Sequence, residues 1–111
     1  SYSYADLHHQ SGRIANYLTQ LGIRKGDRVI VQVEKSPQNL FWYFACMRAG
    51  FIYIPLNTAY LEHEIEYFIA NASPSFALCD PSRRAIFENH ARCKIGTLDG
   101  EGNFLDDNAL G

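Results

Sequence analysis

The spacing of hydrophobic and polar positions along the chain predicts helices that alternate with strands. Apolar residues three or four positions apart indicate amphipathic helices, and short, nearly continuous apolar runs indicate strands buried in a sheet. The predicted helices span residues 3–21, 36–49, 61–72 and 80–90, and the predicted strands span residues 28–33, 51–56, 75–79 and 93–98. Because the connections are long enough for right-handed parallel crossovers, we expect an α/β fold. It is a three-layer, doubly wound domain that begins with a helix and holds a mainly parallel sheet of about four strands.

Local signals mark the ends of the predicted helices. Ser3 and Asp6 have the spacing of a capping box, in which each side chain binds a backbone N–H at the start of the helix. Ser36 followed by Pro37 is typical of a helix start, with serine as the cap and proline in the first turn. The helix over residues 36–49 is apolar on almost every side. We therefore expect it to be buried on more than one side, with one apolar side left bare in a chain of this length.

The predicted strand 51–56 is followed by a polar loop that we regard as the candidate binding element. Gly50 suits the left-handed position just past a helix, and the apolar run after it suggests a strand that is covered on both faces. Pro55 cannot donate to a ladder, so it should lie where strand pairing ends. Asn57 and Thr58 then lie at the carboxyl end of the strand, which is where ligands bind in open α/β sheets.

Composition excludes several classes of protein. The 111 residues suffice for one domain with one core, and a hydrophobic content of 47% favours a packed globule over disorder. Ten basic and 12 acidic residues give a net charge of −2, which argues against a nucleic-acid partner. No apolar stretch approaches the roughly 20 residues of a membrane span. The odd, widely spaced set of Cys46, Cys79 and Cys93 indicates reduced thiols in a cytoplasmic protein.

Residues with reactive side chains do not form a catalytic or metal-binding pattern. His8 and His9 diverge on a helix, and His63 lies between glutamates, so all three are interpreted as surface residues. His90 and Cys93 are too few ligands for zinc. We therefore predict no catalytic residue and no metal ligand in this chain.

Other polar and aromatic candidates have structural explanations. Cys79 ends a strand, but no histidine is placed near it by sequence, so we interpret it as a buried structural cysteine. Asp27, Asp80 and Asp99 each follow a turn or cap pattern and should bind local backbone N–H groups. The aromatic run at 41–44 has no basic residues among it, so packing is favoured over stacking on a nucleobase.

Three motifs resemble the N-terminal domain of acyl-CoA synthetases. They are GDRV at 26–29, EKS at 34–36 and RAGFIYIPLNTAY at 48–60. These enzymes belong to the adenylate-forming superfamily, together with luciferases and peptide-synthetase adenylation domains, and the malonyl-CoA synthetase branch is the most similar. The likeness covers residues 3–80 well. At position 61, where related enzymes carry a Ser or Thr cap, this chain has Leu61, which should cost about 1 kcal/mol of local stability.

The resemblance implies an ATP-dependent acid–CoA ligase that forms an acyl-adenylate and then an acyl-CoA thioester, from malonate or another short carboxylic acid. ATP, CoA and Mg²⁺ are then implied for the complete enzyme, and the loop of Asn57 and Thr58 lies on the side from which CoA approaches. The superfamily's phosphate-binding loop and catalytic lysine have no match in this chain. We therefore expect residues 1–111 to be a partial N-terminal subdomain, a scaffold that is inactive alone and able to self-associate.

A second interpretation is a free-standing flavodoxin-like or receiver-like module that binds a ligand without catalysis. Receivers gather acidic residues at the ends of their early strands, whereas here only Asp80 follows the third strand. Flavodoxins begin with a strand, whereas this chain begins with a helix. Residues 99–111 are polar and rich in glycine, so we expect a weakly structured tail in which Phe104 and Leu105 are the residues able to hold it to the domain.

Overall fold

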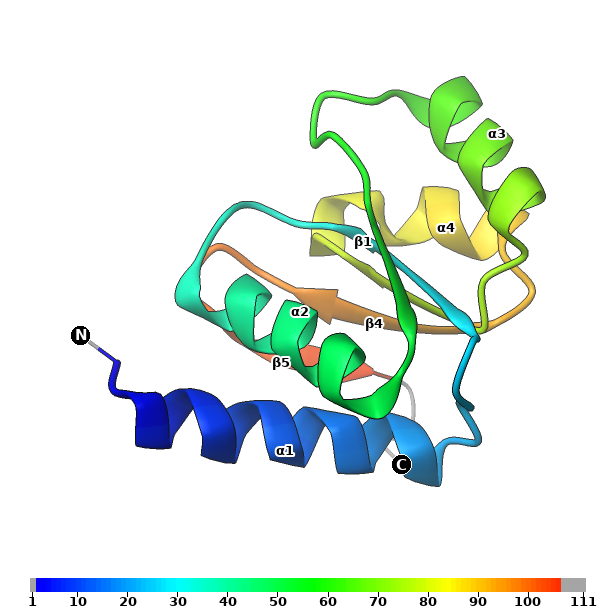
Figure 1. Cartoon of the computed structure of the whole chain (residues 1–111). Helices are drawn as coiled ribbons and strands as arrows, with labels where there is room; N and C mark the ends of the chain where they lie inside the picture. Colours follow the sequence, from blue (N-terminus) through cyan, green and yellow to red (C-terminus); the bar gives the residue numbers. More distant parts are fainter. Residues whose placement is uncertain (1, 107–111) are drawn as a thin grey trace.

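A computed structural model describes residues 2–106 and shows helices packed on both faces of one sheet (Figure 1). The elements in chain order are α1 (Tyr4–Gln20), β1 (Arg28–Gln32), α2 (Pro37–Ala49), β2 (Ile52–Pro55), α3 (Glu62–Ala72), β3 (Phe76–Cys79), a 3₁₀ turn η1 (Pro81–Arg83), α4 (Arg84–His90), β4 (Lys94–Leu98) and β5 (Phe104–Asp106). The α/β class and the alternation of helices and strands are confirmed.

The sheet has the order β2-β1-β3-β4-β5, in which the first four strands are parallel and β5 is antiparallel to β4. In the middle of the sheet, Ile30 lies opposite Ile54 on one side and Ala77 on the other. Helices α1 and α2 cover one face, and α3 and α4 cover the other (Figure 1). The predicted three-layer, mainly parallel arrangement is therefore confirmed.

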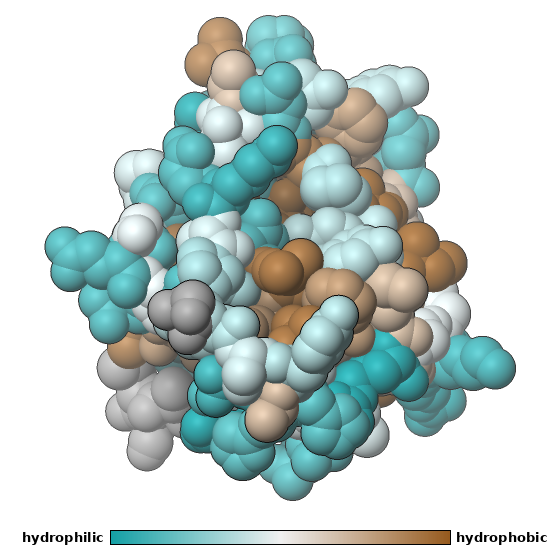
Figure 2. Space-filling model, turned by 60° about the vertical axis from the view of Figure 1, so that its left-hand side comes forward, coloured by the Kyte–Doolittle hydropathy of each residue, from teal (hydrophilic) through white to brown (hydrophobic). Residues whose placement is uncertain are grey.

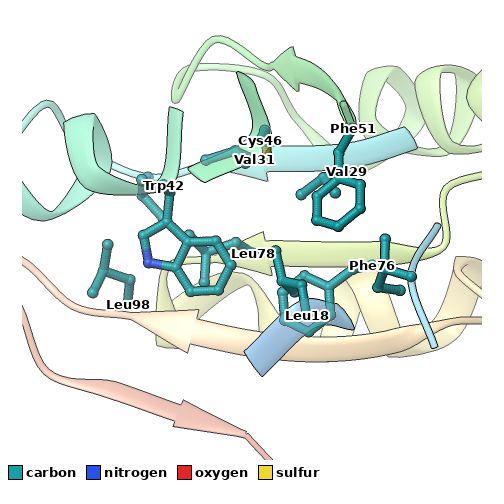
Figure 3. Packing of buried hydrophobic residues seen from close by; sticks show 11 residues of the cluster. Leu18, Val29, Val31, Trp42, Cys46, Phe51, Phe76, Leu78 and Leu98 are labelled. Atoms are coloured by element: carbon teal, nitrogen blue, oxygen red, sulfur yellow. The ribbon is translucent and has the colours of Figure 1, made fainter. Parts of the chain in front are cut away.

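Each face of the sheet has its own hydrophobic core. On the α1 and α2 side, side chains from both helices point toward those of the strands (Figure 3), and this cluster includes Leu18, Trp42, Cys46, Phe51, Val29, Val31, Phe76, Leu78 and Leu98. On the other side, α3 and α4 pack on the sheet through Ile65, Ile69, Phe87, Ile30, Ala77 and Ile95. Because β1 and β3 contribute to both clusters, their nearly continuous apolar sequences are explained by burial on two faces.

The predicted ends of α1 are confirmed. The Ser3 Oγ accepts a hydrogen bond from the Asp6 N–H at 3.1 Å, and the Asp6 Oδ2 accepts from the Ser3 N–H at 3.1 Å. After the helix, Gly22 has a φ of +99°, and the Ile23 N–H donates to the Leu18 carbonyl at 3.1 Å. Both ends are set by residues close in sequence, which is why sequence patterns predict them well.

Helix α2 is buried on one side and bare on another. Its N-terminal cap is the predicted one, because the Ser36 Oγ accepts from the Asn39 N–H at 3.1 Å. An apolar stripe, which consists of Leu40, Tyr43 and Met47, remains 49%, 39% and 57% exposed. These residues recur at the spacing of one helix side, so the expected uncovered side is present.

Strand β2 lies at the edge of the sheet, which corrects the expectation that residues 51–56 are covered on both faces. Ile52 is 49% exposed, because β2 has a neighbouring strand on one side only. Pro55 is the last residue of β2, as predicted, and the following Leu56 N–H donates to the Val31 carbonyl at 2.8 Å. An apolar run indicates a strand, but it does not distinguish an edge from the centre of a sheet.

The C-terminal segment contains a strand that the sequence does not predict. Residues 99–111 are expected to be weakly structured, but Phe104–Asp106 forms β5 and pairs with β4, with Phe104 opposite Leu98. The Phe104 ring packs against Tyr17 and Trp42, at centroid distances of 5.4 and 5.2 Å. A strand this short depends on such tertiary contacts and leaves little periodicity in the sequence. Residues 107–111 lie outside the described part of the chain.

Side chains of one histidine and two glutamates form contacts between α3 and α4. The His90 Nε2 lies 2.8 Å from the Glu62 carboxylate, and its Nδ1 lies 3.6 Å from that of Glu66. These glutamates are exposed as predicted, but they also contact α4. At the start of α3, the Glu64 Oε1 accepts from the Leu61 N–H at 2.9 Å, so one half of a capping box persists without a capping side chain at Leu61.

Candidate functional site

The carboxyl ends of β1 and β3 form the topological switch point of the sheet. The chain leaves β1 toward β2 on one side, whereas β3 and β4 follow on the other side. In Figure 1 β1 and β4 run toward the left. Figure 2 brings that side of the molecule forward and shows hydrophobic side chains in the middle of this face, with polar ones around them. Open α/β sheets bind ligands at such an edge, because the loops diverge there and leave a crevice.

A polar pocket of ≈ 160 Å³ lies at the switch point. It is lined by residues from the end of β1, the loop between β2 and α3, and the loop between β3 and α4, namely Gln32, Val33, Glu34, Thr58, Asp80, Ser82 and Arg83. The predicted binding residue Thr58 is therefore part of a pocket. Its neighbours come from positions far away in the sequence.

Gln32 is a buried polar residue at the end of β1, with a side chain that holds the loop after β2. It is 1% exposed, and its Nε2 donates to the carbonyl oxygens of Asn57 at 2.9 Å and Tyr60 at 3.4 Å. Since carbonyl oxygens only accept hydrogen bonds, these contacts determine which way the amide points. The Gln32 Oε1 is buried and has no hydrogen-bond partner within residues 2–106.

Arg83 also holds this loop, through hydrogen bonds to two of its carbonyl oxygens. Its Nη1 donates to the Tyr60 carbonyl at 2.9 Å and its Nη2 donates to the Thr58 carbonyl at 3.2 Å. The planar guanidinium thus binds two carbonyl oxygens at once, a geometry that lysine cannot reproduce. Together with Gln32, it holds the loop by three of its carbonyl groups.

Asn57 is exposed at the carboxyl end of β2, and its side chain accepts a hydrogen bond from the backbone of its own loop. Its Oδ1 accepts from the Ala59 N–H at 2.8 Å, and the Tyr60 N–H donates to the Asn57 carbonyl at 3.1 Å. This is the side-chain turn that asparagine commonly forms two residues ahead. The predicted location of Asn57 and Thr58 at the carboxyl end of β2 agrees with the structure, and their role toward CoA remains a prediction.

The aspartates bind local backbone groups, as predicted. The Asp80 Oδ2 accepts from the Ser82 N–H at 3.0 Å and from the Ser82 hydroxyl at 2.6 Å. The Asp27 Oδ2 accepts from the Arg24 N–H at 2.8 Å. The lining of the pocket includes two carboxylates, Glu34 and Asp80, and one guanidinium, Arg83.

The cysteines are placed for packing rather than for nucleophilic chemistry. Cys46 and Cys79 are fully buried, and burial raises the pKa of each thiol to about 12. Cys93 is partly buried, and burial raises its pKa to about 11. Because the thiolate is the nucleophile, thiols with pKa values this high are inert at neutral pH. The interpretation of Cys79 as a structural residue is therefore supported.

A second, more apolar pocket of ≈ 410 Å³ lies between α1, α2 and the last two strands. It is lined by Tyr2, Gln10, Arg13, Ile14, Tyr17, Gln38, Phe41, Trp42, Leu98, Gly102 and Phe104. The Trp42 ring stacks on Phe76 at 5.7 Å, as expected of an aromatic run that serves packing.

Within the described residues there is no group of three or more His, Cys, Asp or Glu side chains placed to hold a metal. Nor does that part of the chain contain a helix both long and apolar enough to cross a bilayer.

Gln32 and Arg83 are the site residues that sequence reasoning missed. Gln32 had a usable signal, because it is the polar residue of an otherwise apolar strand end, VIVQV at 29–33. Arg83 had no such signal, because the next residue is also an arginine, Arg84, and the sequence does not show which of the two contacts the loop. The structure separates the two: Arg83 binds the loop, and the Arg84 Nε pairs with Glu88 at 3.3 Å.

Comparison with known proteins identifies relatives that share most of this chain. A family model described as "AMP-binding enzyme" matches residues 1–106. The crotonobetaine/carnitine–CoA ligase of Salmonella paratyphi C is 36% identical in an alignment 104 residues long, which covers 86% of this chain and 20% of that protein.

Solved structures give the same picture. MatB from Rhodopseudomonas palustris, without ligand, superimposes with a TM-score of 0.88 and 45% identity, over 92% of this chain and 21% of that chain. The ATP-bound form of MatB matches with a TM-score of 0.89 and the same identity and coverage. A benzoate CoA ligase from Burkholderia xenovorans shares the fold, with a TM-score of 0.84 at 15% identity, over 92% of this chain and 22% of that chain. This chain thus spans about a fifth of the length of these relatives.

Proposed function

Since the chain belongs to the AMP-binding enzyme family, we propose that the complete protein is an AMP-forming acid–CoA ligase. In this reaction a carboxylate oxygen attacks the α-phosphorus of ATP and pyrophosphate leaves, which gives an acyl-adenylate. The CoA thiol then attacks the acyl carbon and AMP leaves, which gives the thioester. The observation that carries this proposal is the 45% identity to MatB over 92% of the chain, in a protein that binds ATP in a solved structure.

Malonate is the acid that we propose as substrate, with other short carboxylic acids next. The support is the 45% identity to MatB, a malonyl-CoA synthetase, over 92% of this chain. The 36% identity to a crotonobetaine/carnitine–CoA ligase favours a second candidate class, acids that carry a quaternary ammonium group.

This chain supplies scaffold to the proposed ligase and no catalytic group. We propose that Asn57 and Thr58 border the path of CoA, because their loop lies at the switch point where ligands of α/β sheets bind. Mg²⁺ would neutralise phosphate charge in the complete enzyme, but the described residues offer no cluster that fits it, so we assign it to no residue here. Residues 1–111 alone should therefore be inactive.

A free-standing binding module remains the alternative, and one observation favours it. The strand order β2-β1-β3-β4-β5 is the flavodoxin-like order. Three features differ from such a module, namely the antiparallel β5, the initial helix and the bare apolar stripe on α2.

We also propose a cytoplasmic location, which the free, buried thiols of Cys46 and Cys79 support.

The proposed function is tested by following pyrophosphate release from the full-length protein. The acids to compare are malonate, methylmalonate, acetate, carnitine and a long-chain fatty acid, each with and without CoA. We expect malonate-selective turnover with formation of malonyl-CoA, and no turnover by residues 1–111 alone. Selective turnover of carnitine would retain the ligase and replace the substrate. No adenylation of any acid would favour the binding module.

A further inference from the structure

We propose that Gln32 and Arg83 are positioning residues that hold the loop of residues 57–60 in the conformation that receives CoA. This inference rests on the proposed function, because it assigns a task to the loop that borders the CoA path. Neither residue needs to touch the reacting atoms. Each acts through the main chain of Asn57, Thr58 and Tyr60.

The loop has little backbone support of its own. The ladder between β1 and β2 ends at the hydrogen bond from the Leu56 N–H to the Val31 carbonyl, at 2.8 Å. Beyond it, one backbone hydrogen bond is described within residues 57–60. It runs from the Tyr60 N–H to the Asn57 carbonyl, at 3.1 Å. Side-chain donors therefore supply the remaining contacts to the loop carbonyls. Removal of the Arg83 side chain takes this donor from the partly buried Thr58 carbonyl, which is costly. Removal of the Gln32 amide takes one of two donors from each of the Asn57 and Tyr60 carbonyls.

Gln32 also joins the two loops that flank the pocket. Its side chain donates to the loop after β2, while its backbone carbonyl accepts from the Asp80 N–H at 3.1 Å. Asp80 in turn accepts from Ser82 at the start of η1, the turn that carries Arg83. A displacement of either loop thus disturbs the other, which explains how one conformation is maintained at an exposed edge.

Position and charge are separable at Arg83. If the residue acts by positioning, its two-pronged contact with Thr58 and Tyr60 matters. If it attracts the anionic CoA, its positive charge matters. Arg83→Lys keeps the charge and loses the paired geometry, so it distinguishes the two. Arg92→Ala is a matched control, because Arg92 is exposed and precedes β4, at the amino ends of the parallel strands and away from the pocket.

The test measures KM for CoA and for ATP in the full-length protein with Arg83→Ala, Arg83→Lys, Gln32→Met and Arg92→Ala. We expect Arg83→Ala to raise KM for CoA about tenfold, in line with the loss of hydrogen bonds from a charged donor, while KM for ATP changes less than about twofold. Arg83→Lys should recover only part of this loss. Gln32→Met, which keeps the side-chain volume, should act in the same direction as Arg83→Ala.

Amide hydrogen exchange supplies a readout that does not depend on activity. The amides of residues 57–61 should exchange faster in Arg83→Ala and Gln32→Met than in the wild type, and should be unchanged in Arg92→Ala. Exchange at the β3 and β4 amides should not change in any of them, which separates a loosened loop from general destabilisation.

Each contrary outcome has a distinct meaning. Wild-type protein that turns over no acid with CoA overturns the proposed function, and the inference with it. A ligase in which Arg83→Ala behaves like Arg92→Ala in both KM and exchange retains the function and overturns the inference. The inference is also overturned if Arg83→Lys restores KM for CoA without restoring slow exchange, or if KM for ATP rises equally.

Discussion

Asn57 uses its side chain within its own loop as well as presenting it to solvent. The Oδ1 accepts from the Ala59 N–H at 2.8 Å, which keeps the chain turned at the carboxyl end of β2. The same residue offers its carbonyl to Gln32. Loop shape and ligand contact therefore have to be separated by the choice of substitution.

Asn57→Ala should raise KM for CoA more than KM for ATP in the full-length protein, by up to about tenfold, because the loop loses its internal hydrogen bond. Asn57→Ser is the matched control, since a serine hydroxyl can still accept from the backbone two residues ahead. It should remain within about twofold of the wild type. Steady-state kinetics with each substrate varied check this prediction. Equal or absent effects on both KM values would remove Asn57 from the site.

Asp99 makes the stability of the turn before β5 depend on pH. Hydrogen bonds from Asn103, both backbone and side chain, lower the pKa of the Asp99 carboxyl below its ordinary 3.8. A lowered pKa means that the charged form is favoured in the folded state. The stabilisation is therefore complete above the ordinary pKa and is lost as the pH falls through the lower pKa of the folded state.

Asp99→Asn should weaken the acid sensitivity of the chain. We expect the wild type to lose more stability than this variant between about pH 5 and about pH 3, because only the wild type has a carboxylate to protonate at this position. Urea unfolding at both pH values measures the difference. Parallel pH dependence in the two proteins would show that the turn carboxylate does not contribute.

At the scale of elements, β4 depends on a glycine that faces an aromatic cluster. A Cβ at Gly96 would lie 2.6 Å from the Phe104 Cε1 and 3.0 Å from the Phe76 Cζ. Both rings belong to the packing between the sheet and α1 and α2. The small residue thus lets β5 approach β4 with the Phe104 ring in place.

Gly96→Ala should destabilise the chain by about 1–3 kcal/mol, the usual cost of overpacking a core. Gly100→Ala is the control, because nothing lies within 4 Å of a Cβ at that position. It should be close to neutral. Denaturant midpoints of the two variants and the wild type provide the comparison, and equal stability of both variants would contradict this account of β5.

Elements differ in how well local sequence predicts them. The ends of α1 and α2 are predicted correctly because a serine cap and a glycine stop act within one or two helical turns. Strand β5 is missed because it has three residues and depends on pairing with β4. The fourth helix is predicted as one piece, whereas it begins as the 3₁₀ turn η1 and continues as α4.

At the scale of the whole molecule, the stripe of Leu40, Tyr43 and Met47 is an exposed apolar surface on α2. The same helix buries Trp42 and Cys46 on its other side, so the stripe cannot turn inward. Exposed apolar residues on one helix side favour contact with another apolar surface.

Residues 1–111 prepared alone should therefore self-associate through the stripe. Light scattering over a range of concentrations measures this, and the double variant Leu40→Glu, Met47→Glu should shift the chain toward monomer. Tyr67→Glu is the control, because Tyr67 is 63% exposed on α3, on the other side of the sheet. A clean wild-type monomer at high concentration would contradict the prediction.

By itself, the sequence determined the alternation of helices and strands, the helix ends and the placement of Asn57 and Thr58 after a strand. These features depend on periodicity and on contacts a few residues apart. Only the tertiary structure decided the strand order, the edge position of β2, the pairing of β5 and the hold of Gln32 and Arg83 on the loop. Arg83 reaches a carbonyl 25 residues earlier in the chain, and no local pattern specifies such a contact.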